Sequence, residues 1–200
     1  MVKRFFLSPI FVFLVMLGQS APALGATPAD SIKQTTDKIM AILADPDLLP
    51  PEKAGERKKE IRAAVDKRFD WGEMSKRALG RHWQKRTAQE REAFTSVFAR
   101  LLEGAYMEKV VNYSGEKVNY ENEQVDGDYG AVTAKIFTSK NEEISVEYRL
   151  RKKAEDWLVY DVSIEGVSLV NNYRTQFNNI LRNASFQELM KRLEEKVHGK

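Results

Sequence analysis

Cysteine is absent from the sequence and histidine occurs only twice, and these shortages exclude several kinds of site. Without cysteine the chain forms no disulfide, and it cannot be a lipoprotein, because the residue acylated after such a signal is cysteine. His82 and His198 alone cannot complete a structural zinc site, which needs a full set of nitrogen and sulfur ligands. The expected fold is therefore stabilised by its apolar core, with no metal and no cofactor.

Long apolar runs are also missing, apart from one near the N-terminus. Residues 5–17 are mostly apolar, follow Lys3 and Arg4, and precede a stretch of small residues. The run is shorter than the roughly 20 residues that a membrane-spanning helix needs, and the small residues suit a signal peptidase. We predict a cleaved signal peptide over residues 1–26 and one exported domain over residues 27–200, with no stable membrane insertion; an uncleaved anchor is the alternative.

Neither an excess of one charge nor a catalytic motif is present. Without Lys3 and Arg4 the formal net charge of +3 becomes +1, which argues against nucleic acid as a partner. The sequence has no G-x-S-x-G elbow and no glycine-rich phosphate loop, and Ser163 and Ser168 have no neighbouring histidine or lysine. The sequence therefore predicts no enzymatic activity.

Apolar spacing predicts a series of helices first. The first has Asp30 as its cap, a charged helix starts near Glu52, and a short one runs from Asp70 to Gly80. The capping box at residues 87–90 opens a long helix. Its apolar residues recur at helical spacing: Phe94, Val97, Phe98, Leu101, Leu102, Ala105 and Tyr106.

The apolar period changes to two from Glu116, which predicts strands. Strict alternation places one set of side chains inward: Ile144, Val146, Tyr148, Leu150, Leu158, Tyr160, Val162 and Ile164. Glu147, Asp161 and Glu165 then fall on the opposite, polar face. The pattern predicts a meandering antiparallel sheet with one apolar face, followed by two helices, over residues 170–182 and from Ser185.

Periodicity alone does not distinguish a filled core from a lined pocket, because every globular domain needs apolar faces. An enzyme acting on a hydrophobic small molecule in an α+β cavity would need an inward acid or histidine, and the strand alternation predicts only two inward tyrosines as titratable groups. A module that binds envelope proteins is the other alternative.

Two blocks of the sequence resemble the MlaC family, the toluene-tolerance auxiliary proteins. FDWGEMSKRALGRHW at residues 69–83 is similar to the family's FD…M…ALG.HW segment, and Thr87, Phe94, Phe98, Leu102 and Tyr106 match its long helix. WLVYDVSIEGVSLVNNYRTQF at residues 157–177 resembles the family's most characteristic block. The resemblance covers nearly all of the predicted mature chain.

The resemblance implies a single α+β domain in the periplasm, with a curved, mainly antiparallel sheet and helices around a deep apolar cavity for phospholipid acyl chains. It also implies a carrier that shuttles phospholipid between an outer-membrane MlaA-type lipoprotein with its porin and the inner-membrane Mla ABC transporter. Such a system maintains the lipid asymmetry of the outer membrane. No covalent chemistry is expected of the carrier.

The inward phase and the resemblance together suggest which residues line the cavity, with packing in an ordinary core as the alternative for each. The expected lining residues are Trp71, Met74, Phe94, Phe98, Leu102, Tyr106, Val132, Ile136, Val146, Tyr148, Tyr160, Val162, Leu169, Tyr173 and Phe177. Arg174 is interpreted as a member of a structural ion pair, with a place near the cavity mouth as the alternative.

Overall fold

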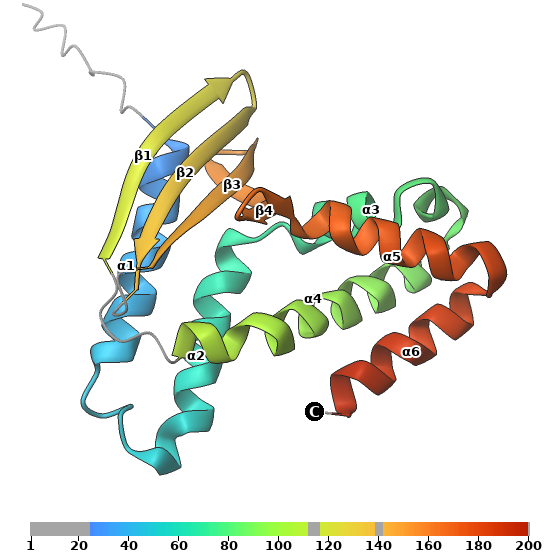
Figure 1. The fold of residues 1–200 in the computed structure, drawn as a ribbon, viewed down its shortest axis with the longest axis horizontal. Coiled ribbons are helices and arrows are strands. Elements are labelled where there is room, and N and C mark those ends of the chain that lie inside the picture. The colour runs from blue at the N-terminus through green and yellow to red at the C-terminus, as the bar shows by residue number, and fades with distance from the viewer. Residues whose placement is uncertain (1–24, 112–116, 139–141, 200) are drawn as a thin grey trace, which may run out of the picture.

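An open sheet and a group of helices lie along the long axis of the molecule in the computed structural model, which describes residues 25–111, 117–138 and 142–199 (Figure 1). The sheet and the first two helices occupy one end, and the later helices form the other. Nearly all of the predicted signal peptide falls on residues 1–24, outside the described part. Within that part, no helix has the length and apolar content that crossing a bilayer requires.

The first two helices form an antiparallel pair. Helix α1 (Pro28–Ala44) is joined to α2 (Ala54–Arg68) through a 3₁₀ turn, η1 (Pro51–Lys53). Thr27, not Asp30, caps α1: the Thr27 hydroxyl accepts from the Asp30 N–H at 3.1 Å, and the Asp30 carboxylate accepts from the Thr27 N–H at 3.1 Å. The predicted cap is therefore wrong by three residues, because Asp30 is the second member of a capping box.

The next helices begin where their capping residues predict. Asp70 caps the short helix α3 (Trp71–Leu79), and its carboxylate accepts from the Glu73 N–H at 3.0 Å. After a 3₁₀ turn, η2 (Gly80–Lys85), the capping box at residues 87–90 opens the long helix α4 (Ala88–Val111), with reciprocal hydrogen bonds of 3.1 and 2.8 Å.

The strands form one antiparallel meander in the order of the sequence. They are β1 (Lys117–Asp126), β2 (Tyr129–Phe137), β3 (Glu143–Lys153), β4 (Asp156–Ile164) and the two-residue β5 (Val167–Ser168). The antiparallel sheet predicted from alternation is therefore confirmed. The short β5 was not predicted, because two residues carry no periodicity.

Strand β4 contains a bulge that its sequence does not reveal. Leu150 of β3 pairs with Val159, whereas the preceding Arg149 pairs with Asp161, so Tyr160 is an extra residue without a partner. An extra residue reverses the side-chain alternation along the rest of the strand.

The bulge changes which β4 residues face inward. Trp157 and Val159 are buried before it, at 5% and 0% exposure, and Val162 is buried after it. Leu158 and Tyr160, which strict alternation placed inward, are half-buried on the other face. The predicted orientation of Leu158 and Tyr160 is therefore wrong. Residues 157–160 are all apolar or aromatic, so the sequence is compatible with either alternate set of side chains facing inward.

Two helices complete the chain. Ser168 caps α5 (Leu169–Asn183), with its hydroxyl accepting from the Asn171 N–H at 3.0 Å. Ser185 caps α6 (Phe186–His198), as its sequence predicts.

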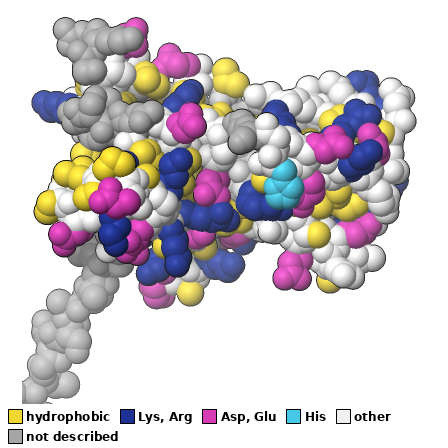
Figure 2. All heavy atoms as spheres, turned by 90° about the horizontal axis from the view of Figure 1, so that it is seen from below, with side chains coloured by type: hydrophobic (Ala, Val, Ile, Leu, Met, Phe, Trp, Pro, Cys, Tyr) yellow, Lys and Arg dark blue, Asp and Glu magenta, His cyan; other side chains and the backbone are white. Residues whose placement is uncertain are grey.

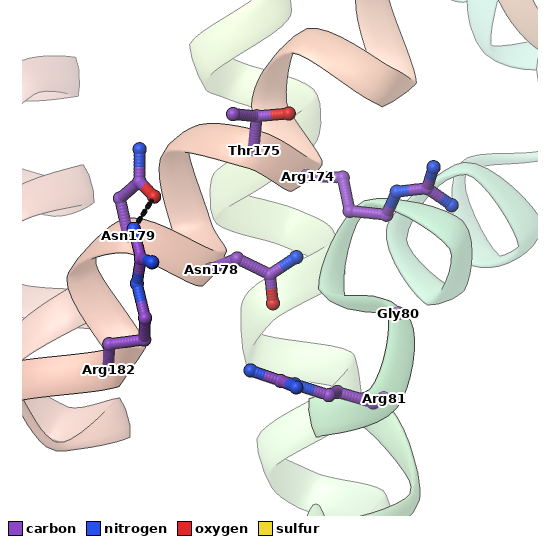
Figure 3. A pocket seen from close by; sticks show the side chains of 7 residues that line it. All are labelled: Gly80, Arg81, Arg174, Thr175, Asn178, Asn179 and Arg182. Atoms are coloured by element: carbon purple, nitrogen blue, oxygen red, sulfur yellow. Dashed lines mark hydrogen bonds between the residues drawn. The ribbon is translucent and has the colours of Figure 1, made fainter.

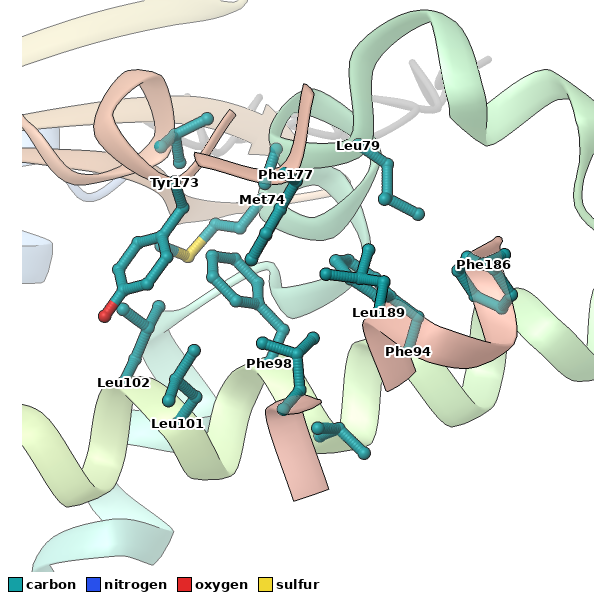
Figure 4. Close-up of a cluster of buried hydrophobic side chains, with 14 residues drawn as sticks. Met74, Leu79, Phe94, Phe98, Leu101, Leu102, Tyr173, Phe177, Phe186 and Leu189 are labelled. Atoms are coloured by element: carbon teal, nitrogen blue, oxygen red, sulfur yellow. The ribbon is translucent and has the colours of Figure 1, made fainter. Parts of the chain in front are cut away.

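The interior is divided into two hydrophobic clusters. The helical core joins α3, α4, α5 and α6, and its large members are Met74, Leu79, Phe94, Phe98, Leu101, Leu102, Tyr173, Phe177, Phe186 and Leu189 (Figure 4). The sheet core consists of Ile32, Val132, Val146, Leu150, Trp157, Val159, Val162 and Leu169. Only the half-buried Phe69 and Tyr106 pack against both clusters among the described residues.

Candidate functional site

A pocket of about 830 Å³ lies between the sheet and helices α1, α2 and α4. Its volume falls within the range of about 300–1,000 Å³ that is usual for small-molecule sites. The walls are mostly aliphatic and aromatic, and strands β1 to β4 all contribute to them. Many of these apolar side chains are neither buried nor exposed, because the pocket separates them from the opposite wall.

Nine of the fifteen residues predicted to line a cavity are in the wall of this pocket. They are Trp71, Met74, Leu102, Tyr106, Ile136, Val146, Tyr148, Val162 and Leu169. Contact between these side chains and a ligand stays a prediction.

Four of the other six pack against one another in the helical core. Phe98 lies edge-on to Tyr173 and to Phe177, with ring centroids 5.3 and 5.7 Å apart, and Phe94 meets Phe177 at 5.6 Å (Figure 4). The apolar stripe of α4 is divided: its first half packs on α5 and α6, and its second half faces the pocket. The periodicity of one helix does not show where such a division falls.

Val132 and Tyr160 are also outside the pocket wall. Val132 is 1% exposed within the sheet core. Tyr160 lies on the outer face because of the bulge, edge-on to Tyr129 at 6.0 Å and beneath the Arg77 guanidinium at 4.1 Å.

Several lining residues were not singled out from the sequence. Helices α1 and α2 form one side of the pocket, and the second half of α4 contributes further residues to its wall. These residues are Ile39, Met40, Leu43, Ile61, Val65, Met107 and Val110. The helical spacing of Ile39 with Leu43, and of Ile61 with Val65, was the available signal.

Three charged side chains of the wall, Arg62, Asp66 and Glu103, form ion pairs with one another. Arg62 forms ion pairs with Glu103 on α4 and with Asp66, whose Oδ2 lies 3.5 Å from the Arg62 Nε. The Trp71 indole N–H donates to the Asp66 Oδ1 at 2.8 Å. This network joins α2, α3 and α4, and its members lie too far apart in the sequence to be paired by inspection.

Asp161 is a buried carboxylate, but it does not line the pocket. It accepts hydrogen bonds from the Ser168 hydroxyl at 2.6 Å and from the Val170 N–H at 3.1 Å, so it supports the start of α5. Ser168, considered above as a nucleophile, is thus a helix cap. In the described part of the chain, no cluster of acidic, histidine or cysteine side chains has an arrangement that could hold a metal ion.

Two tyrosines of the wall remain uncharged at neutral pH. Burial raises the pKa of the Tyr148 hydroxyl to about 12, with a further contribution from Tyr120, because desolvation penalises the phenolate. Burial also raises the pKa of Tyr106. The interior of the pocket therefore offers mainly apolar surface, with two tyrosine hydroxyls that stay protonated.

The outer surface carries charges of both signs. Seen from below, Lys and Arg side chains alternate with Asp and Glu across the middle of the molecule, and hydrophobic side chains reach the surface at the end that holds the sheet, α1 and α2 (Figure 2). Arg149 pairs with Glu147, and Arg151 pairs with Asp70. The ion pair predicted for Arg174 is wrong: its side chain is exposed, and none of the ion pairs among described residues includes it.

The model of the MlaC protein family matches residues 33–195. The chain belongs to the MlaC family. It is 24% identical over 124 residues to the intermembrane phospholipid transport system binding protein MlaC of Haemophilus influenzae, covering 60% of this chain. The match spans 58% of that relative, which is less than two thirds of its length.

A solved structure resembles this MlaC-family protein over most of its length. It is the phospholipid-binding protein of Ralstonia solanacearum in complex with a phospholipid, with a TM-score of 0.74 and 26% sequence identity. The match covers 86% of this chain and 97% of that one. The two sequence blocks that carried the resemblance form α3 with η2, and β4 through the first half of α5. The predicted fold class, a single α+β domain with an antiparallel sheet packed against helices, is confirmed.

Proposed function

We propose that this protein is a periplasmic phospholipid carrier and that the pocket between the sheet and helices α1, α2 and α4 holds the acyl chains. The observation that supports this most directly is the pocket of about 830 Å³ with mostly aliphatic and aromatic walls. The Ralstonia relative is a phospholipid-binding protein, and the Haemophilus relative is a binding protein of an intermembrane phospholipid transport system.

The physical reason for such a pocket is the cost of exposing acyl chains to water. Burial of a methylene contributes about 0.8 kcal/mol, so two chains of roughly 15 methylenes represent about 24 kcal/mol. A carrier must offset most of that cost and still release the lipid. Continuous aliphatic and aromatic walls do so without specific hydrogen bonds, and the nine predicted residues in the wall would make these contacts.

The proposed partners are those that the resemblance to the family implies. The carrier would accept and deliver phospholipid between an outer-membrane MlaA-type lipoprotein with its porin and the inner-membrane Mla ABC transporter, and so maintain outer-membrane asymmetry. It would perform no covalent chemistry and need no cofactor, with phospholipid as cargo.

Lipid extraction from the purified protein tests this proposal. Protein isolated without added lipid is extracted with organic solvent, and phospholipid per protein is measured by mass spectrometry. A double variant, Met40→Trp with Met107→Trp, narrows the pocket from α1 and α4 and should carry roughly half the lipid or less, because a close-packed interior accommodates little extra volume.

Met190→Trp is the matched control. Met190 is also half-buried, but it packs against the helical core on α6, away from the pocket. It should carry as much lipid as the unchanged protein. Wild-type protein that is empty after every gentle isolation, or equal lipid content in both variants, would refute the proposed pocket.

A further inference from the structure

A second hollow, of about 370 Å³, lies between η2 and the outer face of α5 and shares no lining residue with the apolar pocket. Arg81, Arg174 and Arg182 line it together with Asn178 and Asn179 (Figure 3). Its wall contains no carboxylate. Guanidinium groups donate hydrogen bonds and accept none, so the charge of this wall is positive and its bonding capacity is mainly that of donors.

The arginines of this hollow differ from the others in the described part of the chain. Seven arginines elsewhere form ion pairs with carboxylates. Three more donate to backbone carbonyls, as Arg68 does to Trp157 at 2.7 Å. The three described arginines with neither kind of acceptor, Arg81, Arg174 and Arg182, all line the same hollow.

Arg174 and Arg182 contact neighbouring groups around the hollow, although both side chains are exposed. Arg174 lies over Gly80, where an added Cβ would come within 3.4 Å of the Arg174 Cδ (Figure 3). Arg182 donates to the Asn179 amide oxygen, and the Asn178 amide oxygen lies 2.9 Å from the His82 Nε2. The hydrogen bonds among the residues around the hollow therefore involve neutral acceptors, and the three positive charges are not compensated by a carboxylate.

We propose that this hollow is a docking site for an acidic segment of a partner protein, which places two or more carboxylates among the three guanidiniums. Bidentate pairing of arginine with carboxylate supplies the recognition. The hollow suits a protruding peptide side chain better than a membrane surface. Membrane binding usually adds an apolar anchor, and none of the large exposed hydrophobic side chains, Leu49, Val125, Tyr129 and Val167, lines it.

The test uses isotope-labelled full-length mature protein and nuclear magnetic resonance. A blocked hexapeptide of alternating glutamate and aspartate is titrated while the side-chain signals of Asn178, Asn179 and the arginines are followed. A hexapeptide of glutamine and asparagine, inorganic phosphate, and phosphatidylcholine vesicles with phosphatidylglycerol are titrated separately. We expect saturable shifts with the acidic peptide alone, and weaker binding at higher salt, because exposed charges are screened.

Two triple variants with the same charge change give the matched comparison. Arg81→Gln, Arg174→Gln and Arg182→Gln together should weaken peptide binding roughly tenfold, because exposed charge pairs are individually weak and three are lost at once. Lys58→Gln, Lys59→Gln and Lys67→Gln remove three exposed cations of α2 and should leave binding nearly unchanged.

Several outcomes would overturn the proposal. Shifts caused by phosphate or by vesicles but not by the acidic peptide would assign the hollow to a different ligand. An equal loss of peptide affinity in both triple variants would show that binding depends on net charge and not on this hollow. The lipid content of the arginine variant should equal that of wild type, so failure of this site is distinguishable from failure of the carrier function.

Discussion

Asp70 links the start of α3 to the sheet through its two carboxylate oxygens. One oxygen accepts from the Glu73 N–H at 3.0 Å, and the other accepts from the Arg151 guanidinium at 2.7 and 3.0 Å. Burial by itself would raise the pKa of Asp70, but the hydrogen bond from Glu73 and the charge of Arg151 outweigh it, so the pKa is lowered. The folded state therefore favours the ionised carboxylate.

Asp70→Asn should lower the free energy of unfolding by about 1.5–3 kcal/mol at neutral pH, because a buried charged hydrogen bond is lost while the helix cap is kept. A lowered pKa stabilises the fold above the unfolded value of about 3.9, and this stabilisation is lost as pH falls through the folded pKa. The difference between the two proteins should therefore shrink below about pH 4.

Urea unfolding at pH 7, 5 and 3 measures this difference. Glu195→Gln, which removes an exposed ion pair with Lys191, is the control and should change stability little at any of these pH values. A difference between wild type and Asp70→Asn that persists undiminished at pH 3 would contradict the role given to the carboxylate.

At the scale of elements, helix α5 begins at an N-cap, Ser168, that the sequence pattern did not predict. The Ser168 hydroxyl accepts from the Asn171 N–H and donates to the buried Asp161. Ser168→Ala should destabilise the protein by about 1–2 kcal/mol in chemical denaturation, because both bonds are lost and Asp161 stays buried.

Ser168→Thr keeps the hydroxyl and should retain most of the stability. Lipid content should be unchanged in both variants, since Ser168 does not line the apolar pocket. Loss of lipid from a stable, folded Ser168→Ala protein would contradict the assignment of Ser168 as a structural cap.

The sequence predicted elements well where the determining residues are local. The capping box at residues 87–90 and the alternation in β3 depend on residues only a few positions apart, and both are present as expected. The bulge at Tyr160 depends on pairing with β3, and apolar residues at Trp157 and Leu158 fit either phase. The partner of a strand is a property of the fold and not of the segment.

The candidate site shows the same limit. Leu102 of α4 is in the pocket wall, whereas Phe94 and Phe98 on the same face of this helix contact Phe177 of α5. Helical periodicity gives the face of a helix, but it does not give the neighbour that each turn of this face meets.

At the scale of the whole molecule, bound lipid should stabilise the fold, because a ligand that binds only the native state shifts the unfolding equilibrium. We expect removal of the lipid to lower the melting temperature by about 5–10 °C and re-addition to restore it. Scanning calorimetry of extracted and reloaded protein measures this. Equal melting temperatures would show that the lipid contributes nothing to stability.

The Met40→Trp and Met107→Trp double variant provides the comparison for this prediction. It should show a smaller difference between the extracted and reloaded states, since less lipid enters the narrowed pocket. A full-sized difference in that variant would place the stabilising lipid elsewhere on the protein.

The division of the interior into a helical core and a sheet core has a consequence for the lifetime of the protein. Among the half-buried apolar side chains of the described residues, Phe69 and Tyr106 alone pack against both clusters, so apart from polar links such as Asp70 with Arg151 few contacts couple the two parts of the proposed carrier when it is empty. Acyl chains in the apolar pocket would contact residues of both the helical core and the sheet core, and would so couple the two parts. Under the proposed function, unloaded molecules would then open locally more often than loaded ones, and proteases would degrade the unloaded molecules first.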